Sequence, residues 1–295
     1  MFGGVSKLLT RLGKKHPRFK ENPAYRFFLP CYAGIRTGMD RFDAVVRGLT
    51  HKPDPAAAAF FDANADRVNA VAAMLADETS REVWLGLVKY RQTRQRKDYP
   101  RSDWKTPQYF IPEMPFGPNE VFVDCGAYTG DTIAAFVKRV PDYKQITAFE
   151  PDDENHAKIM RKHAGNGKIT AIRAGVYETD GEVGFSMHGN MCSALDTVND
   201  NAVKIEVRAI DSLNLDGVTF VKMDIEGAES GALKGATKTI RAFKPKLAIC
   251  IYHSHEDMLG IAEYIRSLVP EYKLYVRQHG RWPTYNETVL YAVPP

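Results

Sequence analysis

The chain has 295 residues, of which 44% are hydrophobic, and its formal net charge is +4. That length fits one large domain or one domain with an extension. No apolar run approaches the roughly 20 residues that cross a bilayer, and none follows the basic N-terminus, so we expect neither a membrane span nor a secretory signal. The four cysteines, Cys31, Cys125, Cys192 and Cys250, show no paired spacing. This argues against a zinc ribbon or a disulfide framework and favours a cytoplasmic protein.

Basic residues are concentrated at the start of the chain. Up to Arg47, ten lysines and arginines face only Glu21, Asp40 and Asp43. Within the first 20 residues, apolar side chains also recur at helical spacing among the basic ones. This segment is either a solvated terminus, which we favour, or a peripheral contact with an anionic membrane surface or an acidic partner.

The first part of the chain, residues 1–117, is expected to be a helical extension. Asp54 and Pro55 are a typical helix start, and residues 79–82 (TSRE) have the spacing of a capping box. Apolar residues then follow at helical spacing. From residue 99 to 118, prolines and aromatics predict a loop-like connection.

The remaining residues, 118–295, alternate short apolar runs with helical patterns. Such alternation predicts parallel βαβ units in a doubly wound, Rossmann-like α/β sheet. The expected strands are 121–123, 146–149, 169–172, 220–223 and 247–251, and the expected helices are 133–137, 155–160, 228–240 and 258–268.

Two pairs of consecutive strands have no helix between them. Residues 183–186 and 205–210 predict a hairpin-like excursion, and residues 273–277 and 288–293 predict a hairpin at the C-terminus. Strands joined in this way are expected to pair antiparallel, the last pair at an edge of the sheet.

The run VFVDCGAYTGDT, residues 121–132, joins the first strand to a helix. Glycine lets the backbone approach a ligand closely, and a helix N-terminus offers free N–H groups. The strand ends of an open α/β sheet are also where ligands bind. The predicted cofactor-binding residues of this loop are Asp124, Gly126, Ala127, Tyr128, Gly130, Asp131 and Thr132.

The second strand ends in Glu150 and Pro151, which we add to the predicted cofactor site. A carboxylate at that point can accept hydrogen bonds from both hydroxyls of a ribose. A dinucleotide fold would prefer GxGxxG, whereas this loop reads GAYTG after an acid, Asp124. An acid there repels a pyrophosphate and attracts an ammonium group. S-adenosylmethionine carries a ribose, an ammonium and no phosphate, so we prefer it to NAD.

The run VKMDIEGAESGALKGA, residues 221–236, places a third group of acids at a strand end. Asp224 is expected to face the same cleft as Asp124. For Glu229 we prefer a structural role, in which it complements the dipole of the following helix.

Together these motifs resemble the FkbM-type family of S-adenosylmethionine-dependent methyltransferases. The resemblance rests on VFVDCGAYTGDT, AFEPD, AIDSL and FVKMDIEGAE with LKGA, and it runs from about residue 75 to the C-terminus. It implies a class I methyltransferase fold with a terminal antiparallel hairpin. It also implies O-methylation, commonly on hydroxyls of sugars, glycolipids or secondary metabolites.

The resemblance also implies roles for individual residues. Asp124, Gly126, Ala127 and Gly130 would bind the methionine end of the cofactor. Glu150 would bind the ribose, and Asp224 would lie beside the reacting methyl group.

Methyl transfer to a hydroxyl needs a group that removes its proton. His253 follows a strand and is our first candidate base, because an imidazole titrates near neutrality. Asp224 is the other candidate catalytic residue. Ser254 with Asp257 predicts a helix cap beyond which His253 and His255 diverge. A divalent metal between Asp224 and His253 is a less favoured possibility. His279 and Tyr109 are weaker candidates for lining the acceptor pocket.

Three alternatives stay open. One is an NAD-dependent oxidoreductase on the same fold class, and another is a non-catalytic module that keeps the cofactor pocket. The third is RNA 2′-O-methylation, for which Lys222 alone argues only weakly. We expect a small-molecule or glycan acceptor rather than RNA, and no DNA partner.

Overall fold

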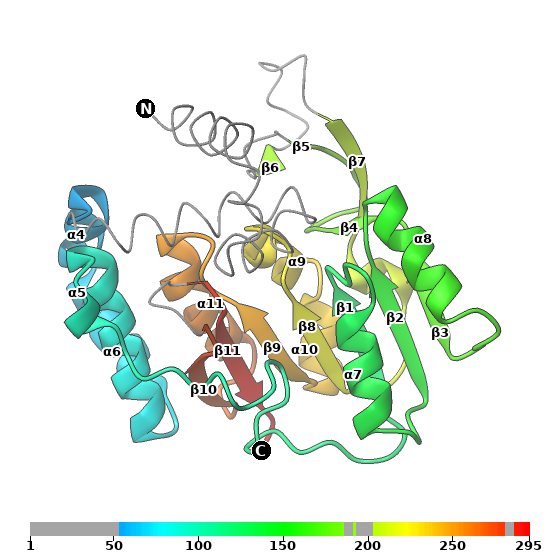
Figure 1. The fold of residues 1–295 in the computed structure, drawn as a ribbon, viewed down its shortest axis with the longest axis horizontal. Coiled ribbons are helices and arrows are strands. Elements are labelled where there is room, and N and C mark those ends of the chain that lie inside the picture. The colour runs from blue at the N-terminus through cyan, green and yellow to red at the C-terminus, as the bar shows by residue number, and fades with distance from the viewer. Residues whose placement is uncertain (1–52, 186–190, 193–202, 281–285) are drawn as a thin grey trace, which may run out of the picture. The chain divides into compact units, whose positions relative to one another are not determined.

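The computed structural model describes residues 53–185, 191–192, 203–280 and 286–295 (Figure 1). The basic N-terminal segment, with its predicted membrane or partner contact, lies outside the described residues. Within them, no helix combines the length and the apolar character that crossing a bilayer requires.

The described chain starts with three helices, α4 (Pro55–Ala63), α5 (Ala65–Met74) and α6 (Glu78–Thr93). The predicted start of α4 is confirmed, since the Asp54 carboxylate accepts the N–H of Ala57 at 3.1 Å. A short 3₁₀ turn, η2 (Arg96–Asp98), follows α6.

The predicted capping box at residues 79–82 is wrong about the residue that caps α6. Asp77 caps the helix instead, because its carboxylate accepts the N–H of Ser80 at 2.7 Å. Aspartate is among the best N-cap residues, and Asp77 stands at the required spacing before Ser80.

In the described part of the chain, seven strands form the main sheet in the order β10-β11-β9-β8-β1-β2-β3. All neighbours are parallel except β11, which is antiparallel to both β9 and β10. This arrangement confirms the predicted doubly wound sheet and its terminal hairpin at the edge. The strands are β1 (Val121–Cys125), β2 (Gln145–Phe149), β3 (Ile169–Ile172), β8 (Phe220–Met223), β9 (Lys246–Cys250), β10 (Lys273–Gln278) and β11 (Thr288–Val293).

Helices connect the parallel strands, as the sequence pattern predicts. They are α7 (Asp131–Arg139), α8 (Asp153–Lys162), α9 (Glu229–Lys234), α10 (Thr237–Phe243) and α11 (His255–Leu268). The prediction of one helix over 228–240 is wrong, because the chain breaks between α9 and α10. At the break, a Cβ on Gly235 would collide with the carbonyl oxygen of Tyr177, and the Gly235 carbonyl accepts the N–H of Asp211 at 2.8 Å.

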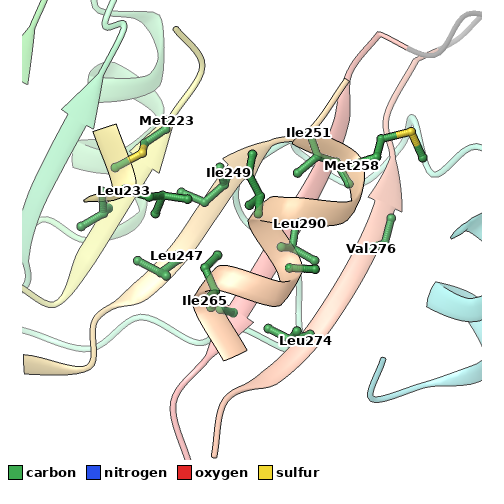
Figure 2. Close-up of a cluster of buried hydrophobic side chains, with 14 of the residues drawn as sticks. Met223, Leu233, Leu247, Ile249, Ile251, Met258, Ile265, Leu274, Val276 and Leu290 are labelled. Atoms are coloured by element: carbon green, nitrogen blue, oxygen red, sulfur yellow. The ribbon is translucent and has the colours of Figure 1, made fainter. Parts of the chain in front are cut away.

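The central strands β1 and β8 are buried on both faces, as is usual for parallel strands. In β1, Val121 and Val123 belong to one core cluster, and Phe122, between them, belongs to the other. The first cluster lies under α11 and includes Leu247, Ile249, Leu274 and Leu290 among others, as Figure 2 shows. The second includes residues of α7, α8 and the 99–120 connection.

A second, smaller sheet has the order β4-β7-β5-β6. Its strands come between β3 and β8 in the chain. Its strands are β4 (Gly175–Val176), β5 (Gly181–Phe185), β6 (Met191–Cys192) and β7 (Val203–Arg208), and the 3₁₀ turn η3 (Ile210–Leu213) follows. Strands β5 and β7 pair antiparallel, which confirms the predicted excursion.

The N-terminal helices are tied to the sheet by a buried arginine. Arg277 of β10 lies 2.6 Å from Asp77, the cap of α6, and 2.5 Å from Glu113 in the 99–120 connection. Helices α4 to α6 belong to the same compact unit as the sheet. The proposed boundary at residues 117 and 118 stays a prediction.

Candidate active site

The predicted site residues follow neighbouring strands at one edge of the main sheet. Strands β2, β1, β8 and β9 are adjacent and parallel, so their carboxyl ends lie together. From β1 the chain adds β2 and β3 toward one edge of the sheet, and it then adds β8 on the other side of β1. The order of the strands therefore reverses between β1 and β8. Ligands of open α/β sheets bind at such a reversal, beyond the carboxyl ends of the strands.

The glycine loop after β1 is held tightly against β2 and β8. The N–H groups of Gly126 and Ala127 both donate to the Phe149 carbonyl at 3.0 Å. Gly126 has a φ of 78°, and a Cβ on it would collide with the Asp224 carbonyl oxygen. Only glycine therefore fits at this point, where β1 and β8 end side by side.

The loop continues through Tyr128 to the start of α7. Tyr128 has a φ of 49°, which is unusual for a non-glycine residue, and its side chain is 46% exposed. Gly130, with a φ of 73°, precedes α7, whose first residues are Asp131 and Thr132. Non-glycine residues held in this region of φ often lie at functional sites.

Glu150 fixes the glycine loop from the end of β2. Its carboxylate accepts the N–H of Tyr128 at 2.8 Å and the N–H of Asp152 at 3.0 Å. Burial raises the pKa of Glu150, and these two N–H groups oppose the shift. A carboxylate oxygen has two lone pairs, so acceptor capacity toward a ribose remains.

Asp124 is fully buried and paired with Lys222 of the neighbouring strand. The Lys222 Nζ lies 3.2 Å from the Asp124 Oδ1 and donates to the Gly126 carbonyl at 2.7 Å. Burial raises the pKa of Asp124 despite Lys222, whereas the nearby carboxylates hold the pKa of Lys222 above its ordinary value. Lys222 thus fastens the glycine loop. The contact of Asp124 with the cofactor stays a prediction.

Asp224 lies just beyond β8, and two tyrosine hydroxyls donate to it. Tyr109 donates to Oδ2 at 2.9 Å, and Tyr252 donates to Oδ1 at 3.0 Å. Burial acts to raise the pKa of Asp224, but Lys222, His253 and the two hydroxyls outweigh it and lower the pKa. Asp224 is therefore an ionised, oriented carboxylate whose side chain is 24% exposed.

His253 lies three residues beyond the end of β9 and is surrounded by carboxylates. Its Nδ1 is 3.0 Å from Glu229, and its Nε2 is 3.7 Å from Asp224 and 3.6 Å from Glu226. Burial acts to lower the pKa of His253, but these carboxylates raise it to about 9. The expectation of titration near neutrality is therefore wrong, because the sequence does not show how many acids meet at this ring.

Glu229 is buried at the first position of α9. Its carboxylate accepts the N–H of Ile225 at 2.8 Å and the N–H of Gly227 at 3.0 Å, besides contacting His253. The prediction that Glu229 complements the dipole of α9 describes only part of its role. Glu229 also fixes the loop between Asp224 and α9 through these hydrogen bonds.

His255 and His279 have partners other than these carboxylates. The predicted cap is confirmed, with Ser254 accepting the N–H of Asp257 at 2.9 Å. His255 diverges from His253 as predicted, since its Nδ1 lies 3.0 Å from Arg91. His279 is 2.8 Å from the Tyr291 hydroxyl, which accepts the N–H of Tyr109.

Sequence reasoning undervalued Lys222 and Glu229 and missed Tyr252. A signal for Lys222 was present: it interrupts the apolar run FVKM, and a lysine in a buried strand needs an acid nearby. In the β1–β8 register Lys222 is paired with Asp124. The contacts of Tyr252 and Glu229 depend on loop geometry that periodicity does not reveal.

The strand order, the antiparallel β11 and the glycine loop after β1 define a class I methyltransferase fold. Residues 124–280 match the methyltransferase FkbM domain. This match covers more than half of the chain, which therefore belongs to the FkbM methyltransferase family. A comparison with curated proteins finds no match.

Among solved structures, the chain is similar to methyltransferase FkbM from Methylobacillus flagellatus KT. The identity is 30% and the TM-score is 0.67, and the match covers 80% of this chain but 60% of that one. An rRNA methylase from Streptococcus thermophilus shares 17% identity, with a TM-score of 0.37 and coverage of 59% and 86%.

Proposed function

We propose that this chain is an S-adenosylmethionine-dependent O-methyltransferase. The observation that carries the proposal is the meeting of the glycine loop, Glu150 and Asp224 at one sheet edge, in a chain of the FkbM family. In the proposal, Asp124, Gly126, Ala127, Tyr128, Gly130, Asp131 and Thr132 form the cofactor loop, and Glu150 with Pro151 binds the ribose.

The burial of Asp124 changes the role that we propose for it. Asp124 was expected to attract the cofactor's ammonium directly, yet it has no exposed surface and is paired with Lys222. We propose that this ion pair instead holds the glycine loop in its conformation. Carbonyl oxygens of the loop and the N–H groups in the first turn of α7 would then contact the methionine end of the cofactor.

Asp224 and His253 are the proposed catalytic residues. A sulfonium methyl is already activated, so the protein has to align the acceptor hydroxyl with it and stabilise the loss of the hydroxyl proton. Asp224 is ionised and held by two tyrosine hydroxyls, which suits it to orient the acceptor. His253 can take the acceptor's proton only after losing its own, because its pKa is raised to about 9.

The proposed acceptor is a hydroxyl of a sugar, a glycolipid or a secondary metabolite. The support is the family, together with polar side chains that can hydrogen-bond a polyol: Asp224 and Tyr252 are partly exposed, and Glu226 is exposed.

Mass spectrometry of glycans and small-molecule extracts tests this function. Extracts of cells with and without the chain are compared, and cells carrying Asp224→Asn serve as a third arm. We expect one class of hydroxylated product to lose a methyl group in cells without the chain and in cells with the variant. Identical methylation in all three arms would overturn the proposal.

A further inference from the structure

A cluster of side chains of the types that bind metal ions lies around His253. Asp224, Glu229 and His253 each offer one ligand atom, and these atoms lie within 4.8 Å of one another. Ligands around a divalent ion at roughly 2.0–2.6 Å lie roughly 4–5 Å apart at most. The three side chains therefore already stand at about the spacing of a coordination shell.

A second observation separates this cluster from an ordinary group of acids. The His253 side chain is only 10% exposed, and neither of its ring nitrogens has a partner in hydrogen-bond geometry. Nevertheless, carboxylate oxygens lie 3.0 Å from Nδ1 and 3.7 Å from Nε2. One of these nitrogens can therefore bind an ion once the ring has lost a proton, since only a deprotonated imidazole nitrogen is a metal ligand.

The two carboxylates are also held as metal ligands usually are. Hydroxyls of Tyr109 and Tyr252 donate to Asp224, and backbone N–H groups donate to both oxygens of Glu229. Outer hydrogen bonds of this kind orient ligating carboxylates and leave further lone pairs on each oxygen. Glu226, exposed and 3.6 Å from Nε2, could add a further oxygen from the solvent side.

We propose that Asp224, Glu229 and His253 bind a divalent transition-metal ion such as Mn²⁺. One imidazole with two carboxylates favours a first-row transition ion over Mg²⁺ or Ca²⁺, which prefer oxygen ligands alone. The binding itself stands without the proposed function. Its consequence rests on that function: His253 would then be a metal ligand instead of the base, and the ion would lower the pKa of the acceptor hydroxyl.

Titration of the chelator-treated, full-length chain with Mn²⁺ tests the site. Binding is followed by calorimetry and by loss of the electron paramagnetic resonance signal of free Mn²⁺. We expect about one ion per chain and weaker binding of Mg²⁺. Since losing an outer partner alone costs about 10–100-fold in metal affinity, His253→Gln should weaken Mn²⁺ binding by at least that much.

His255→Gln is the matched control, because His255 stands two positions away and contacts Arg91 instead. It should bind Mn²⁺ like the parent chain. Asp224→Asn is a second ligand variant of nearly unchanged volume, and circular dichroism checks that each variant is folded. An absence of Mn²⁺ binding at millimolar concentrations, or equal binding by parent and His253→Gln, would overturn the proposal.

Titration with S-adenosylhomocysteine separates the two proposals. A chain that binds S-adenosylhomocysteine but not Mn²⁺ contradicts the metal site and leaves the methyltransferase function standing. A chain that binds Mn²⁺ through His253, and neither binds S-adenosylhomocysteine nor transfers methyl groups, supports the metal site and contradicts the function.

Discussion

The Lys222 ammonium lies 3.2 Å from the Asp124 carboxylate, and both side chains are almost completely buried. The two residues are register partners on adjacent strands, β8 and β1. The same ammonium donates to the carbonyl of Gly126. One buried ion pair therefore joins the two central strands at the point where the cofactor loop begins.

Replacing Lys222 with methionine should destabilise the fold strongly. The change leaves Asp124 as an unpaired buried charge, and breaking such a pair costs about 3–5 kcal/mol. Urea denaturation of the parent and the variant measures this loss. Lys158→Met is the control, because its pair with Glu154 is exposed and should contribute less than about 1 kcal/mol. Equal losses in the two variants would contradict the role given to Lys222.

Gly126→Ala should abolish cofactor binding. Its Cβ would collide with the Asp224 carbonyl oxygen, so the loop or the end of β8 has to move. Gly165→Ala is the matched control, since Gly165 has a similar φ of 79° but open space around it. Calorimetry with S-adenosylhomocysteine should show no heat for the first variant and near-parental affinity for the second. If Gly126→Ala bound S-adenosylhomocysteine with parental affinity, the close approach of Gly126 to the Asp224 carbonyl would not matter for cofactor binding, and the prediction would be wrong.

Glu150→Gln should weaken cofactor binding while the chain stays folded. An amide keeps one acceptor oxygen but loses the charge, and a hydrogen bond to a charged group contributes about 1.5–3 kcal/mol. That corresponds to roughly 10–150-fold in the affinity for S-adenosylhomocysteine. Glu154→Gln, on the exposed side of α8, is the control. An unchanged affinity in Glu150→Gln would remove this residue from the ribose site.

The stability of the fold should depend on His255 at mildly acidic pH. Burial and Arg91 lower the pKa of His255 from 6.5 to about 4, so the folded state favours the neutral ring. Between these pKa values the unfolded chain therefore binds more protons than the folded chain. The stability that the neutral ring contributes is lost as pH falls from 6.5 toward 4. Urea denaturation at pH 7 and pH 5 should show a smaller drop in stability for His255→Gln than for the parent. Equal drops would contradict the lowered pKa.

Sequence patterns predicted the sheet well because each parallel strand is a short apolar run buried on both faces. The ends of elements were harder to predict: Asp77 rather than Thr79 caps α6, and a helix breaks at Gly235, where the carbonyl of Tyr177 approaches closely. At the site, the strand-end acids were predicted from topology. The convergence of Glu226 and Glu229 on His253 was not, because loop conformation sets it.

The central claim is that the loop from Gly126 to Gly130 binds an adenosyl sulfonium cofactor. Calorimetric titration of the full-length chain with S-adenosylhomocysteine and, separately, with NAD tests it most directly. The account predicts saturable heat with S-adenosylhomocysteine and none with NAD. Saturable heat with NAD and none with S-adenosylhomocysteine would contradict it and favour an oxidoreductase.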